Sequence, residues 1–100
     1  MITYTFDNGE EIARGAPLTF QMPPREKREA VVPGNIVKLI FRLENETEAF
    51  VERMWVVVKE RKAGGLFSGT LDNDPQCTEE IRSGIEVTFG PEHIISIYKD

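Results

Sequence analysis

Two residues of this sequence, Cys77 and His93, could carry nucleophilic chemistry, because the chain contains one cysteine and one histidine. A cysteine attacks as its thiolate, which at neutral pH requires a nearby base, and His93 is the histidine able to act as that base. Asn73 or Asp74 could orient the imidazole. These residues belong to no recognised motif, so we predict no catalytic residues. A small cysteine-dependent enzyme that uses Cys77 and His93 is kept as an alternative.

Carboxylates gather in two short stretches, which raises the question of a metal site. Asp72 and Asp74 resemble the start of a calcium-binding loop, but Pro75 and a missing glycine break the pattern. The turn at residues 44–48 lacks the geometry of such a loop, and we expect it to be solvated. With one cysteine and one histidine, a zinc site would need carboxylate ligands, which is uncommon. Nucleotide-binding and hydrolase motifs are also missing from the sequence. We predict no metal and no cofactor.

The single tryptophan, Trp55, is the residue most informative about binding. A lone tryptophan in a small barrel usually lies in the core. If its strand has a face open to solvent, Trp55 would form an aromatic patch with Phe67 and Tyr98. Beside an acidic loop, such a patch suits a basic or apolar protein segment, or a second copy of the chain in a homodimer. The candidate binding residues are Trp55, Phe67, Asp72, Asn73, Asp74 and Tyr98.

The stretch that must position these residues runs from residue 50 to residue 75. It predicts a long strand, a tight turn at Gly64-Gly65, a return strand over residues 66–71, and then the acidic loop. Residues 54–58 are apolar on both faces, which predicts a central strand covered on both sides. Gly69 within the return strand marks a bulge or a close approach of two backbones.

The other segments are short strands joined by turns. Residues 2–6 alternate between apolar and polar side chains, and residues 35–44 place Val37, Leu39, Phe41 and Leu43 on one face. Residues 85–89 and 94–98 predict two closing strands with a tight turn between them. A short helix is predicted near residues 24–31, ended by Pro33-Gly34. Residues 10–20 are expected to be irregular, and residues 76–83 to form at most one helical turn.

These elements predict a mainly β fold, α+β by strict count. We expect a small SH3-like bent sheet or barrel of five to six mostly antiparallel strands, with one short N-terminal helix. The length of 100 residues predicts one domain over residues 1–100. Residues 1–34 would hold the N-terminal strand, the irregular segment and the helix. Residues 35–98 would form a β-meander core.

The charge and the N-terminus argue against two classes of partner. The formal net charge is −5, and the basic residues are spread among acidic ones. A polyanion is a poor match for such a surface, so a nucleic-acid-binding small barrel is a second and disfavoured alternative. No signal peptide and no apolar run of membrane-spanning length is present. We therefore predict a soluble, cytoplasmic protein that binds neither nucleic acid nor membrane.

Four segments carry a resemblance to a known family. They occur in one order and are Gly34-Asn35-Ile36-Val37-Lys38-Leu39-Ile40-Phe41, Glu52-Arg53-Met54-Trp55-Val56, Gly69-Thr70-Leu71-Asp72-Asn73-Asp74-Pro75 and Gly84-Ile85-Glu86-Val87-Thr88-Phe89. Over roughly residues 18–98 the chain resembles the bacterial family catalogued as domain of unknown function 2314. The resemblance implies a fold and a bacterial source, but no activity and no catalytic residues. Size, acidity and the lack of a catalytic set together favour a non-enzymatic protein-interaction module.

Overall fold

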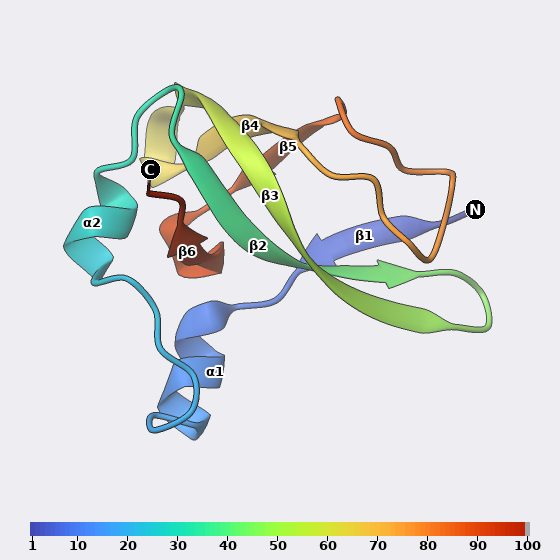
Figure 1. Ribbon diagram of the computed structural model, residues 1–100, viewed down its shortest axis with the longest axis horizontal. Coiled ribbons are helices and arrows are strands. Elements are labelled where there is room, and N and C mark those ends of the chain that lie inside the picture. Colours follow the sequence, from blue (N-terminus) through green and yellow to red (C-terminus); the bar gives the residue numbers. More distant parts are fainter. Residues whose placement is uncertain (100) are drawn as a thin grey trace.

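The computed structural model describes residues 1–99, in which six strands form one curled antiparallel sheet beside two short helices (Figure 1). The strands are β1 (Thr3–Phe6), β2 (Ile36–Glu44), β3 (Ala49–Arg61), β4 (Phe67–Leu71), β5 (Glu86–Phe89) and β6 (Ile94–Ile97). The helices are α1 (Gly9–Gly15) and α2 (Arg25–Glu29), and the 3-10 turns are η1 (Ala63–Gly65) and η2 (Pro91–His93). The predicted small, bent, mainly β sheet is confirmed, and its form is a half-barrel.

Strand β2 lies at the centre of the sheet. It pairs with β3 along one edge, while β1 and β6 share its other edge, at residues 41–44 and 37–39 respectively. Strands β4 and β5 follow β3 in order, as a meander would. The last strand departs from the predicted meander, because β6 returns to β2. That return curls the sheet around one interior.

The interior holds one face of each long strand, as the alternation in the sequence predicted. Val37, Leu39, Phe41 and Leu43 of β2 are fully buried, and Met54, Val56 and Val58 of β3 face the same core. The prediction that residues 54–58 are covered on both faces was wrong for the outer face. Trp55 and Val57 are only half-buried there. A sheet this small encloses one interior, so the outer face of β3 is not packed into a second core.

Two glycine features of the hairpin between β3 and β4 confirm the sequence analysis. Gly64 and Gly65 have φ angles of 76° and 78°, in the left-handed region that favours glycine. Gly69 lies where two backbones approach closely. A Cβ atom at this position would lie 2.6 Å from the carbonyl oxygen of Val57 and 2.6 Å from a methyl group of Val56. The register of the β3–β4 pair also shifts nearby, which places a bulge in the strand pair.

Residues 10–20 were predicted to be irregular, and this was wrong because α1 occupies their first half. The Asn8 side chain caps the helix by accepting from the backbone N–H of Glu11 at 3.1 Å. Asn8 followed by Glu10 and Glu11 is the signal that the sequence analysis missed. Conversely, residues 76–83 contain no helical turn.

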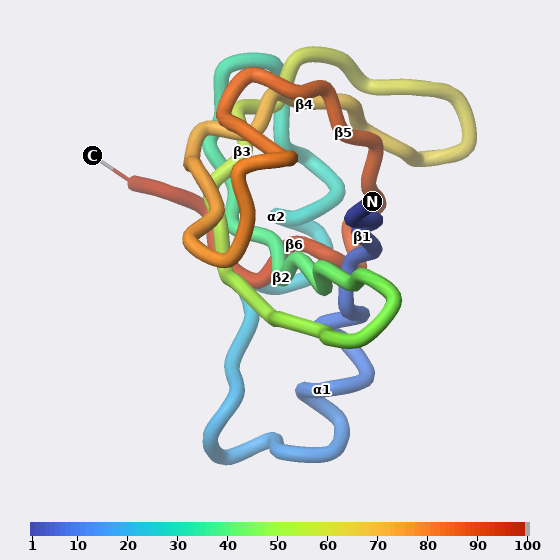
Figure 2. Tube along the Cα trace, turned by 90° about the vertical axis from the view of Figure 1, so that its right-hand side faces the viewer, coloured from blue at the N-terminus to red at the C-terminus, as the bar shows by residue number. Residues whose placement is uncertain are grey.

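The N-terminal segment is tied to the sheet through Arg28, a buried side chain of α2. Its guanidinium donates to the Glu10 carboxylate at 2.8 Å and to the carbonyl oxygens of Pro23 at 2.8 Å and Pro91 at 2.9 Å. Both helices therefore pack against the turn η2 that leads into β6. Figure 2 shows α1 projecting from one end of the sheet.

Candidate functional site

The outer face of the sheet gathers an aromatic pair around Trp55. Lys38 of β2 pairs directly across from Trp55, and its ammonium lies 4.5 Å from the centre of the indole ring. The ring of Tyr98 meets the indole edge to face, with centroids 5.8 Å apart and an angle of 88°. Tyr98 reaches this position because its backbone N–H donates to the carbonyl of Ile36 at 2.8 Å, which prolongs the β6 pairing.

This pair is accessible from solvent. Tyr98 is 53% exposed, and Trp55 is half-buried. The indole N–H makes no hydrogen bond with any other part of residues 1–99 and is not among the buried unsatisfied atoms. The indole N–H is therefore an unpaired donor that is not fully buried. A partly buried amphipathic ring with an unpaired polar atom is typical of binding surfaces.

The acidic loop begins by continuing the sheet beside Trp55. The backbone N–H of Asp72 donates to the carbonyl of Trp55 at 2.9 Å, and the side chain of Asn73 accepts from the backbone N–H of Trp55 at 2.5 Å. Asp74 accepts from the backbone N–H of Ser83 at 2.8 Å, which closes the loop on itself. The Asp72 and Asp74 residues remain exposed. The structure thus brings four of the six predicted binding residues together, namely Trp55, Asp72, Asn73 and Tyr98, with Asp74 one residue further along the loop.

Phe67 does not join that group. It is 2% exposed and packs in the interior against Phe89, with ring centroids 5.8 Å apart. Its position follows from the pleat of β4, in which Phe67, Gly69 and Leu71 share the inner face. An aromatic patch of Trp55, Phe67 and Tyr98 therefore cannot form.

Glu52 holds the far part of the loop and was not predicted as a site residue. Its carboxylate accepts from the backbone N–H groups of Gln76 at 2.9 Å and Cys77 at 2.9 Å. Burial opposes its ionisation, but these backbone donors outweigh burial and lower the pKa of Glu52. The alternation of side chains along β3 did not indicate this role for Glu52, because its hydrogen-bond partners are backbone groups of a distant loop.

Cys77 and His93 lie in different surroundings, and no hydrogen bond joins them within residues 1–99. Burial and the neighbouring Glu52 carboxylate raise the pKa of the Cys77 thiol, which keeps it protonated at neutral pH. His93 Nδ1 accepts from the backbone N–H of Gly90 at 3.0 Å, and its ring packs on Phe6 with centroids 5.5 Å apart. Burial lowers the pKa of His93, against a smaller opposing effect of Glu92. This geometry gives the cysteine-enzyme alternative no support.

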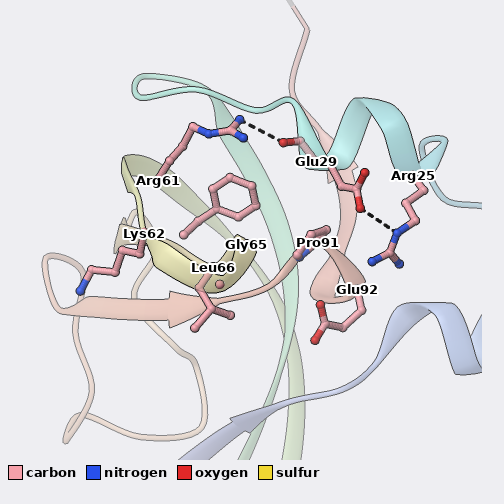
Figure 3. Close-up of a pocket in the computed structure, with 10 residues that line it drawn as sticks. Arg25, Glu29, Arg61, Lys62, Gly65, Leu66, Pro91 and Glu92 are labelled. Atoms are coloured by element: carbon pink, nitrogen blue, oxygen red, sulfur yellow. Dashed lines mark hydrogen bonds and ion pairs between the residues drawn. The ribbon is translucent and has the colours of Figure 1, made fainter.

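A pocket of about 470 Å³ lies between α2, η1 and η2 (Figure 3). Two of its cations are engaged in structural contacts. Arg25 pairs with Glu10 and Glu29, while Arg61 donates to the carbonyl oxygens of Glu29 at 3.0 Å and Val31 at 3.2 Å. Lys62 extends away from the other labelled side chains in Figure 3. The pocket is a junction where charged side chains hold α2 to the hairpin, and the sequence could not predict it because distant segments assemble it.

The described residues hold no group of three or more histidine, cysteine or acidic side chains placed to bind a metal ion. None of the helices in the described part of the chain is long and apolar enough to span a membrane.

The fold and the site define a small half-barrel protein with a half-exposed aromatic pair beside an acidic loop. A family model described as "Uncharacterized protein conserved in bacteria (DUF2314)" matches residues 8–96, so the chain belongs to this bacterial family. The resemblance noted in the sequence is thereby confirmed. Comparison with curated proteins and with solved structures found no match.

Proposed function

We propose that this protein is a non-enzymatic protein-interaction module, which binds a basic or apolar protein segment on its outer face. The single observation that supports this proposal is the Trp55–Tyr98 pair on an uncovered face of the sheet. The exposed residues Asp72 and Asp74 follow directly beside it.

The physical chemistry of the pair suits such a role. Trp55 is held on its backbone by Asn73 and on its ring by Lys38, so little conformational entropy would be lost when a partner contacts it. The unpaired indole N–H offers one directional hydrogen bond, and Tyr98 offers a large aromatic surface. Carboxylates at the rim would raise the association rate of a basic partner.

The experiment captures partners on the immobilised protein, identifies them, and then titrates each purified partner against three variants. Tyr98→Ala removes the more exposed ring, and Trp55→Phe keeps an aromatic side chain but removes the indole N–H. Leu18→Ala is the matched control, because Leu18 is an exposed apolar residue outside this surface. We expect Tyr98→Ala to weaken binding by about thirtyfold, the usual effect of losing a central aromatic contact. Leu18→Ala should leave the affinity unchanged.

Two results would contradict the proposal. One is the capture of no protein at any salt concentration. The other is a partner whose affinity is the same for wild type and Tyr98→Ala, since that partner would bind elsewhere.

A further inference from the structure

One edge of the sheet is left without a neighbour where β3 extends beyond β4. Strand β3 (Ala49–Arg61) pairs with β4 only from Val56 onward, and Asp72 and Asn73 complete the pairing at Trp55. Residues 49–53 pair with β2 on one side. On the other side, no backbone hydrogen bond to them is found within residues 1–99. Figure 1 shows this end of the β2–β3 hairpin extending beyond β4 and β5, with β1 on the side of β2.

The direction of the free backbone groups follows from Trp55. Its N–H and C=O both point away from β2, because they bond to Asn73 and Asp72. The β2–β3 register runs one to one without a shift from residue 49 to residue 57. In an antiparallel pair every second residue points the same way, so Arg53, Val51 and Ala49 also direct their N–H and C=O groups outward. We call residues 49–53 the open edge.

The open edge lacks several of the features by which proteins usually protect such strands. It contains no proline, no lysine and no bulge, and Val51 at its centre is 50% exposed. Its charged residues are the exposed Arg53 and Glu52, whose carboxylate is already bonded to Gln76 and Cys77. Strands β1 and β5 also lie at margins of the sheet, but each is only four residues long, and short edge strands are themselves a protection. The open edge also leads directly into Trp55, so it is continuous with the surface described above.

We propose that the open edge binds an extended protein segment of alternating basic and apolar residues, which adds to the sheet as a further strand. This inference rests on the proposed function and names the partner's chemistry. Backbone hydrogen bonds would provide affinity, and the alternating faces of the added strand would provide specificity. Exposed carboxylates at the two ends of the open edge, Glu48 just before Ala49 and Asp72 beside Trp55, favour basic side chains. Ala49 and Val51, on the outer face with Trp55, favour apolar ones.

A second copy of this chain fits the open edge less well. Each copy carries a net charge of −5, so the two surfaces would repel. An antiparallel pairing centred on Val51 would also make the two Glu52 side chains diagonal neighbours on one face, which is unfavourable. Charge complementarity therefore selects a basic segment as the occupant.

The test uses the full chain and a short acetylated and amidated peptide of alternating lysine and valine, titrated by calorimetry. Val51→Pro removes the central outward N–H without removing a hydrogen bond of the β2–β3 ladder. Val51→Ala is its matched control, which shortens the side chain and keeps the N–H. We expect Val51→Pro to weaken peptide binding at least about tenfold, because a hydrogen bond is lost and the ring blocks the edge. Val51→Ala should weaken it much less.

Amide hydrogen exchange of the wild-type protein provides a readout that does not depend on how the proline variant folds. The peptide should slow exchange at Val51 and Arg53 and should leave exchange at exposed loop amides unchanged. The same peptide with glutamate in place of lysine should not bind, and high salt should weaken the lysine peptide.

The outcomes separate this inference from the proposed function. Binding that Tyr98→Ala weakens and Val51→Pro does not would overturn strand addition while the interaction surface stands. Equal binding of the glutamate peptide, or no binding of the lysine peptide, would overturn the assigned chemistry. Self-association of the protein alone, with exchange at Val51 slowed as concentration rises, would make a second copy the occupant and overturn the proposal.

Discussion

Replacing Arg28 and Arg25 one at a time by methionine should show that Arg28 stabilises the fold and that Arg25 contributes little, although both bond to the carboxylate of Glu10. Both guanidinium groups bond to Glu10, but the Arg28 side chain is 7% exposed and that of Arg25 is 55% exposed. Arg28 also donates to the carbonyl oxygens of Pro23 and Pro91, whereas the other ion pair of Arg25 is with Glu29 of its own helix. Methionine keeps the length and the apolar stem of either side chain.

The expected magnitudes follow from those contacts. Arg28→Met removes charge-assisted hydrogen bonds to two carbonyl groups and one carboxylate in a buried place, for a loss of about 3 kcal/mol in the free energy of unfolding. Arg25→Met removes exposed ion pairs, for a loss of about 0.5 kcal/mol. In a domain of this size the first loss corresponds to a fall in melting temperature of about 15 °C.

Urea unfolding followed by the fluorescence of Trp55 measures both variants. Equal losses for the two variants, or a loss below about 1 kcal/mol for Arg28→Met, would refute the view that Arg28 ties the N-terminal segment to the sheet.

The pH dependence gives a second readout. The hydrogen bond from Arg28 is the main reason that the pKa of Glu10 is lowered, against the opposing effect of burial. That contribution is complete above the unfolded pKa of about 4.3 and disappears as the pH falls through the folded pKa. The difference between wild type and Arg28→Met should therefore shrink in acid.

Three further predictions concern single positions. Gly69→Ala should lower the free energy of unfolding by about 2 kcal/mol, because its Cβ would meet the backbone of Val57, whereas Gly15→Ala, with open space around it, should be nearly neutral in the same urea titration. Burial lowers the pKa of His93, so the folded state binds a proton less readily than the unfolded state. Stability should then fall as the pH drops below about 6.5, and thermal melts of His93→Gln should lack that fall. Cys77 should react slowly with a thiol probe at neutral pH and faster only well above about 8.5, with no change in His93→Gln; rapid reaction at neutral pH that depends on His93 would revive the enzyme alternative.

The strands were predictable because their side chains meet one interior. A period of two in residues 35–44 and 85–89 reports burial on one face, and that face is buried in the fold. The glycine pair at 64–65 was predictable for a different reason, since its backbone conformation excludes most other residues. In both cases the information is local to the sequence.

The features that were not predicted depend instead on contacts between distant parts of the chain. Whether Trp55 faces the core or solvent depends on whether another layer of the fold covers it, and the pattern of residues 54–58 is apolar either way. The interior position of Phe67 depends on the register between β3 and β4, which includes a bulge. The anchors of the acidic loop are side chains that bond to distant backbone groups, as Glu52 does with Gln76 and Cys77. Hydrogen bonds of this kind produce no periodic pattern in the sequence. Helix α1 is the exception, because its Asn8 cap was visible in the sequence.

Asn73 connects the two proposals physically. By accepting the backbone N–H of Trp55, its side chain takes the place that a residue of β4 would occupy in a longer strand. The loop can then leave the sheet at this point and cross to Glu52, and the edge of β3 that faces away from β2 is left unpaired before Trp55. One side-chain hydrogen bond thus fixes the orientation of Trp55 and marks the start of the open edge. A partner that adds a strand there must end beside Trp55, so the aromatic pair and the open edge would contact the same ligand.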